Sequence, residues 1–169
     1  MKRKTILFIL IAFGGAIAVG GTYWWQRGDA LWVQPPSDIA KRQMMIHDRG
    51  SLVMPFDLAK TTHSFNKTPE GGIQQVRAKD PNDREQIALI RSHLKAEQER
   101  FAKGDFGDPQ TLHGESMPGI AVLKESPGAF TVAYEELADG AQLAYRSSDP
   151  RIIDAFHEWF MAQTMDHGL

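Results

Sequence analysis

Histidine and methionine are the residues of this chain whose types and spacing best suit a chemical role. The sequence has six histidines, seven methionines and no cysteine, and imidazole and thioether groups are good copper ligands. In the stretch QTLHGESMPG, at residues 110–119, His113 stands four residues before Met117. His157 precedes Met161 by the same interval in a predicted helix, where residues four apart share a face. Both pairs are therefore candidate metal ligands.

Two further histidines extend this set. His63 lies in the segment TTHSFNK, which alternates as a strand does, and His167 follows Asp166, which can ligate a metal or orient the neighbouring imidazole. We hypothesise a copper or other transition-metal site formed from His63, His113, Met117, His157 and His167. The alternative is structural, because methionines often serve as packing residues and the imidazole of His113 can cap backbone carbonyls. For the loop around His113 we favour the structural interpretation.

Sequence patterns of common catalytic and nucleotide-binding sites are missing. The chain contains no GxSxG, GxxxxGK[ST] or GxGxxG motif. His63 and Ser64 point to opposite faces of a strand, so they cannot form a nucleophile–base pair. The lack of cysteine excludes disulfides, thiolate zinc sites, attached c-type haem and cysteine nucleophiles. A hydrolase with His63 or His113 as general base is a third hypothesis, but it lacks a recognisable partner residue.

The N-terminus predicts a membrane segment. Three basic residues precede residues 5–26, which carry no charge, and a helix needs about 20 residues to cross the hydrocarbon core. Basic residues before the apolar run place the N-terminus in the cytoplasm, and Tyr23, Trp24 and Trp25 suit the membrane interface. Residues 1–26 are thus a single-pass inner-membrane anchor or, alternatively, a cleaved signal peptide. Both readings put the following domain in the periplasm.

The rest of the chain divides into a connector and one domain. We expect residues 27–56 to form the connector, in which the segment after Pro35-Pro36 predicts a short helix capped by Ser37. Residues 57–169 are long enough for one folded domain. The whole chain has a formal net charge of −2, and the part beyond the basic N-terminus is more acidic. This charge argues against nucleic-acid binding, which needs a basic face.

Two hairpins, each followed by a helix, are predicted in the domain. TTHSFNK and IQQVRAK flank the turn PEGG, while AFTVAYEEL and AQLAYRS flank Asp139-Gly140. Asp80-Pro81 and Asp149-Pro150 then predict helix starts, because aspartate can cap a helix and proline suits its first position. The helices have these apolar stripes: Ile87, Ile90, Leu94 and Phe101; Ile152, Phe156, Trp159 and Phe160. We therefore predict an α+β fold, an N-terminal transmembrane helix followed by an antiparallel sheet with two main helices on one face.

The segment between these halves is predicted to be an ordered turn. In GDFGDP, at residues 104–109, we expect Asp105 and Asp108 to accept hydrogen bonds from nearby backbone amides and Phe106 to point inward. The segment lacks the further oxygen ligands and the terminal glutamate of a calcium loop. Residues 118–124 predict a short helix.

Several segments resemble a family of small envelope proteins from Gram-negative bacteria. They are THSFNKTPEGGIQQV, IALIRSHLKAEQERFAKGDFGDPQTLHGESMPG and DPRIIDAFHEWFMAQTMDHG, and GDFxDP…HGxxMPG is the most specific pattern. The resemblance covers most of the chain after Asp57. Some members carry the name aspartate carbamoyltransferase, but the STRT and HPxQ motifs of such enzymes are missing here.

The sequence therefore favours a binding or accessory domain over an enzyme. Its predicted partners are the inner membrane and an envelope protein or small ligand. The alternative is a periplasmic copper or transition-metal-binding protein that uses histidine and methionine ligands.

Overall fold

The computed structural model describes residues 37–167, which belong to one compact unit that begins at Ser37. The predicted membrane anchor at residues 1–26 and the first part of the connector lie outside the described residues. Within residues 37–167, no helix is long and apolar enough to cross a membrane.

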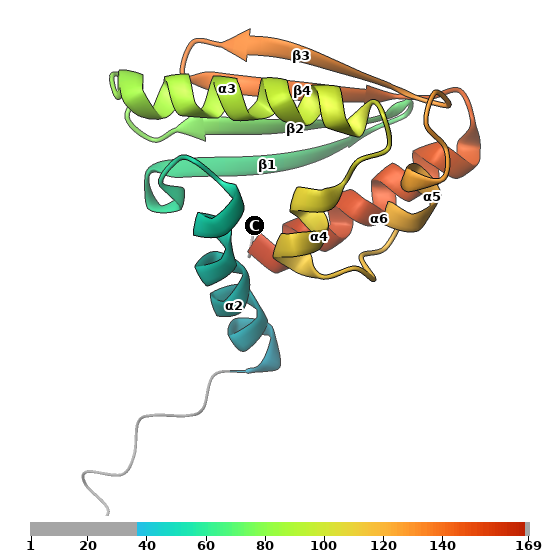
Figure 1. The fold of residues 1–169 in the computed structure, drawn as a ribbon, viewed down its shortest axis with the longest axis horizontal. Helices are drawn as coiled ribbons and strands as arrows, with labels where there is room; N and C mark the ends of the chain where they lie inside the picture. The colour runs from blue at the N-terminus through green and yellow to red at the C-terminus, as the bar shows by residue number, and fades with distance from the viewer. Residues whose placement is uncertain (1–36, 168–169) are drawn as a thin grey trace, which may run out of the picture. The chain divides into compact units, whose positions relative to one another are not determined.

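A four-stranded antiparallel sheet forms the centre of this unit (Figure 1). The first hairpin pairs β1 (Thr61–Thr68) with β2 (Gly71–Ala78), and the second pairs β3 (Thr131–Leu137) with β4 (Gly140–Arg146). The strand order is β1-β2-β4-β3, so the hairpins join through the antiparallel central strands β2 and β4. The predicted α+β class and the antiparallel sheet are confirmed.

Two long helices cover one face of the sheet. They are α3 (Arg84–Phe101) and α6 (Pro150–His167), each of which follows one of the hairpins. The ring of Tyr145, on the buried side of β4, contacts Phe101 of α3 and Trp159 of α6, with ring centroids 6.4 and 5.5 Å apart. One side chain of the sheet thus touches both helices, which places them on the same side.

Side chains along the central strands β2 and β4 point alternately to the two faces of the sheet, which decides which of them enter the core. Gln74 of β2 pairs with Leu143 of β4 in the sheet register, and both side chains are buried. The hydroxyl of Tyr145 donates a hydrogen bond of 2.6 Å to Gln74 Oε1, which satisfies both polar groups inside the core. Gly72 makes room for α6, because a Cβ at this position would lie 2.3 Å from the ring of Phe160.

The starts of the two long helices differ in how well the sequence predicted them. Helix α6 begins at Pro150, and Asp149 accepts a hydrogen bond of 2.9 Å from the backbone N–H two residues later, as expected. Helix α3 begins at Arg84 and is capped by Asp83, so the predicted start at Asp80-Pro81 is wrong. Asp80 instead accepts a hydrogen bond from the backbone N–H of the second residue after it and closes a turn.

Three shorter helices complete the unit. They are α2 (Asp38–Val53), α4 (Gly107–His113) and α5 (Ile120–Lys124), the last close to the predicted short helix. Ser37 caps α2, as expected, by accepting a hydrogen bond from a backbone N–H of its first turn. Although α2 lies in the expected connector, it packs against α4 and α6 and buries Ile46. The compact unit therefore begins about one helix earlier than we expected.

The predicted turn at residues 104–109 is partly correct. Phe106 is fully buried, and Asp105 accepts a hydrogen bond of 3.0 Å from the backbone N–H of Gly107. The prediction for Asp108 is wrong, because its carboxylate pairs with the guanidinium of Arg100, with Nη1 and Oδ1 2.9 Å apart. The first turn of α4 carries Asp108 back over the end of α3, where a charged partner replaces the backbone amides.

Candidate functional site

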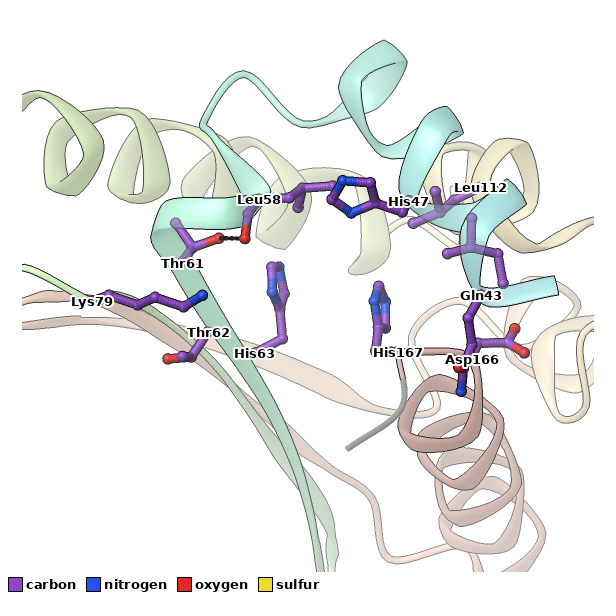
Figure 2. Close-up of a pocket in the computed structure, with 11 residues that line it drawn as sticks. Gln43, His47, Leu58, Thr61, Thr62, His63, Lys79, Leu112, Asp166 and His167 are labelled. Atoms are coloured by element: carbon purple, nitrogen blue, oxygen red, sulfur yellow. Dashed lines mark hydrogen bonds between the residues drawn. The ribbon is translucent and has the colours of Figure 1, made fainter. Parts of the chain in front are cut away.

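A pocket of about 280 Å³ opens where α2, the start of β1 and the end of α6 meet. We call it the imidazole pocket, and Figure 2 shows the side chains around it. Its polar lining includes Gln43, His47, Thr62, His63, Asp166 and His167. Because these residues come from segments far apart in the sequence, the pocket exists only in the folded chain.

Two imidazoles lie face to face in its wall. The rings of His63 and His167 are stacked, with centroids 5.5 Å apart and planes inclined by 2°, and both are directed into the pocket (Figure 2). Burial lowers the pKa of His63 to about 3, and the nearby His167 and His93 add to this effect. Burial also lowers the pKa of His167 to about 4. Both rings are therefore neutral at pH 7, and each has one nitrogen that can accept a hydrogen bond or bind a metal.

Asp166 fixes a third imidazole next to this pair. Its Oδ2 lies 2.8 Å from His113 Nδ1, and the ring of His113 meets His167 edge-on, with centroids 5.2 Å apart. A carboxylate only accepts hydrogen bonds, so Nδ1 carries the proton and Nε2 does not. The guanidinium of Arg42 donates to both oxygens of Asp166, to Oδ2 at 2.7 Å. Burial raises the pKa of Asp166, but the hydrogen bonds from Arg42 and His113 outweigh it and hold the pKa below its ordinary value.

The other side of the His113 ring faces Gln163. Burial lowers the pKa of His113, although the hydrogen bond to Asp166 opposes this shift. His113 Nε2 and Gln163 Oε1 are buried acceptors without partners, and a 180° rotation of the amide would let its NH₂ group satisfy Nε2. The side chain of His113 is 0% exposed, so it cannot meet a substrate from solvent. Its geometry therefore offers no support for a general base at this position.

A second cluster lies on α3. His93 and Glu97 are four residues apart on the buried face of α3, and Asp108 reaches them from α4. One donor atom from each lies within 4.8 Å of the others. Within residues 37–167, this is the one group of three histidine or carboxyl side chains with donor atoms so close together. We call these three residues the α3 cluster. The ring of Phe56 contacts a histidine of each site, with centroids 5.6 Å from His93 and 5.8 Å from His63.

The structure brings together three of the five predicted metal ligands, His63, His113 and His167. Met117 instead packs in the hydrophobic core at 6% exposure. His157 lies on α6 away from the pocket, where its Nε2 is 2.9 Å from the carbonyl oxygen of Thr68. The prediction that His113 caps backbone carbonyls is wrong, because its Nδ1 pairs with Asp166.

Sequence reasoning missed several residues that the structure places in or next to these two sites, among them Arg42, His93, Glu97 and Gln163. The spacing of His93 and Glu97 on a strongly predicted helix was a usable signal, because residues four apart share a face. Arg42 gave no such signal, since it meets Asp166 across 124 positions of sequence. Only the packing of α2 against α6 makes that pair.

Comparison with known proteins gives no match: no family model, no curated protein and no solved structure matches this chain. The resemblance to small envelope proteins therefore stays a prediction. A function for this chain is therefore inferred from the geometry of the two sites.

Proposed function

We propose that this chain is a membrane-anchored periplasmic binding domain that takes a small polar ligand in the imidazole pocket. The observation that carries the proposal is the imidazole of His63, which lines an open pocket and whose buried Nε2 has no hydrogen-bond partner among the described residues. Leaving a buried polar atom unpaired costs about 1–3 kcal/mol. A ligand that donates a hydrogen bond to this nitrogen would remove that cost.

The charges around the pocket favour a polar ligand without a large net charge. His63 and His167 are neutral, and the Asp166 carboxylate is already paired with Arg42. Lys79 donates its ammonium hydrogen bond to the carbonyl of Ala59. Among these groups only the Lys79 ammonium lacks an oppositely charged partner, so recognition rests on hydrogen bonds from neutral groups and on this single positive charge.

Two features support membrane attachment. Residues 5–26 are uncharged and long enough to span a bilayer, and three basic residues precede them. The first described helix, α2, also leaves large apolar side chains exposed: Ile39, Met44, Met45 and Leu52. Exposed apolar groups on a helix suit the boundary between lipid headgroups and acyl chains.

A transition metal is the second candidate ligand. It is favoured by the contacts of His167 with His63 and with His113, all three with lowered pKa values, because metals bind the neutral imidazole. However, their donor atoms do not all lie within 4.8 Å of one another, and Met117 and His157 are elsewhere. We therefore rank this candidate below a small polar molecule.

The binding proposal is tested by NMR of histidine Cε1–H signals in the full chain in detergent. The probes are Zn²⁺, Cu⁺, inorganic phosphate, citrate and glucose, each added separately. We expect at least one probe to shift the His63 and His167 signals together, and His63→Gln to abolish its binding. His157→Gln is the matched control, because this histidine is outside the pocket. If no probe moves these two signals, the proposed ligand site is rejected for these ligand classes.

The membrane topology is tested separately with reporters fused after residue 169. Alkaline phosphatase, which matures only outside the cytoplasm, should be active, and green fluorescent protein exported in the unfolded state should remain dark. A fluorescent fusion with inactive phosphatase would place the domain in the cytoplasm and overturn this part of the proposal.

A further inference from the structure

The α3 cluster has the donor set and the spacing of a metal site. His93 Nε2 lies 3.4 Å from Glu97 Oε1, and one oxygen of Asp108 lies within 4.8 Å of one donor atom of each of these residues. One imidazole and two carboxylates form a mixed nitrogen and oxygen donor set that suits a first-row divalent ion. The cluster is buried, since the side chains of His93 and Glu97 are 7% and 4% exposed.

His93 Nε2 gives an independent indication of a ligand. The atom is buried and has no hydrogen-bond partner within residues 37–167, although a carboxylate oxygen lies close to it. The two atoms are therefore near each other without being aligned for a hydrogen bond. In a tetrahedral zinc site with bonds of about 2.0–2.2 Å, neighbouring donors are separated by roughly 3.3–3.6 Å. The observed separation of 3.4 Å falls in that range.

The charges of the cluster also favour a cation. Arg100 pairs with Asp108, whereas Glu97 makes its one ion pair among the described residues with His93, which is charged only when protonated. With a neutral His93, two carboxylates share a single guanidinium. Each carboxylate oxygen has two lone pairs, so Asp108 can keep Arg100 and still bind a metal. A divalent ion would neutralise Glu97 without breaking the existing pair.

We propose that His93, Glu97 and Asp108 bind one divalent transition-metal ion, with Zn²⁺ as the best fit. The fourth position of the ion would take a water molecule on the side of Asp108, whose side chain is 22% exposed. This site shares no residue with the lining of the imidazole pocket, although Phe56 contacts a histidine of each. A competing explanation is a protonated His93 that forms an ion pair with Glu97 and binds no metal.

The test is Zn²⁺ titration by calorimetry on the full chain in detergent, stripped with a chelator and purified through a tag without histidine. We expect one Zn²⁺ per chain with a dissociation constant below about 1 μM. Glu97→Gln and His93→Gln should each weaken binding by more than about 100-fold, because even lost supporting contacts cost 10–100-fold. Glu99→Gln, an exposed position on the same helix, is the matched control and should bind normally.

Two further readouts separate the outcomes. Co²⁺ should give the visible absorption of a tetrahedral site in the unaltered chain and in His63→Gln, but not in Glu97→Gln. Asp108→Asn, a change at a partly exposed position, replaces Glu97→Gln if circular dichroism shows that the latter does not fold.

Binding lost in His63→Gln but kept in His93→Gln would overturn the inference and favour a metal in the imidazole pocket. Absence of binding tighter than about 10 μM would overturn it and leave the small-ligand proposal standing.

Discussion

The α3 cluster and the imidazole pocket each contain a histidine that contacts Phe56, but they use histidine in different ways. In the α3 cluster, two of the three donors come from one turn of α3 and the third from α4. In the pocket, His63 and His167 come from β1 and from the end of α6, and their nearest neighbours are other rings. One site is therefore a compact set of donors, and the other is a cavity wall.

The difference shows that the partner of a buried imidazole decides what it can do. A carboxylate close to His93 supplies charge for a cation, whereas a second imidazole close to His63 only lowers its pKa further. His113 is a third case, because Asp166 holds its Nδ1 and Gln163 covers the remaining nitrogen. The three environments suit a metal ligand, a hydrogen-bonding wall and a structural link.

Removal of the Phe56 ring, which contacts a histidine of each site, should have the largest effect on stability. Phe56 is 4% exposed, and truncation of a buried phenylalanine costs about 3–5 kcal/mol. Phe56→Ala should lower the free energy of unfolding by that amount, as measured by urea denaturation followed by circular dichroism. Phe56→Leu is the control and should lose less than half as much, because it fills most of the space. A loss below about 1 kcal/mol for Phe56→Ala would show that the ring does not pack tightly against the two histidines.

Removal of the Asp166 carboxylate, which links His113 to Arg42, should cause the next largest loss of stability. Asp166→Ala leaves the Nδ1–H of His113 buried without an acceptor, at a cost of about 2–3 kcal/mol. Asp166→Asn keeps an acceptor oxygen and should cost less. The exposed pair formed by Arg151 and Asp149 serves as a contrast, because Arg151→Ala should change stability by under about 1 kcal/mol. Equal losses at both pairs would mean that burial of Asp166 contributes nothing.

The sequence predicted the parts of this architecture that depend on local patterns. Alternating residues and turn pairs located both hairpins, and Asp149-Pro150 marked the start of α6. Asp80 and Asp83 are both able to cap a helix, so the sequence could not choose between them, and tertiary packing selected Asp83. Local signals therefore predicted the elements and left one helix start ambiguous.

The sites were less predictable because they depend on contacts between distant segments. The pair of His113 and Asp166 spans 53 positions, and the stack of His63 on His167 joins β1 to the end of α6. No periodicity carries such information. For Met117, a local pattern gave a wrong prediction. Its spacing from His113 suggested a ligand pair, but its side chain packs in the core.

Acidification should destabilise the fold through the pocket. The pKa of His63 is about 3 in the folded chain and about 6.5 when unfolded, so the unfolded state binds more protons between these values. Stability is therefore complete above about pH 6.5 and falls as the pH is lowered towards 3. For His63 alone, the loss between pH 7 and pH 5 is about 2 kcal/mol.

This pH dependence is measured by urea denaturation of the full chain from pH 7 to pH 5. His63→Gln should flatten the curve by the contribution of one histidine, while His167 keeps part of the slope through its own lowered pKa. His157→Gln, outside the pocket, should leave the contribution of His63 in place. An unchanged slope in His63→Gln would mean that the ring is not held neutral by the fold.

The smallest change in stability is expected for a substitution at His47, on the rim of the pocket. The same substitution tests whether the two sites are independent. His47 lines the pocket from α2 but is exposed, so His47→Ala should change the free energy of unfolding by less than about 0.5 kcal/mol. If the pocket binds a ligand, the same substitution should weaken that ligand, because the side chain forms part of the wall. Met45→Ala, an exposed position outside the pocket lining, is the control for any effect on α2 itself.

Zn²⁺ affinity at the α3 cluster should be the same in both variants, since neither side chain is part of that donor set. A fall in Zn²⁺ affinity in His47→Ala alone would mean that the ion binds in the pocket, and the division of the histidines into two sites would be wrong.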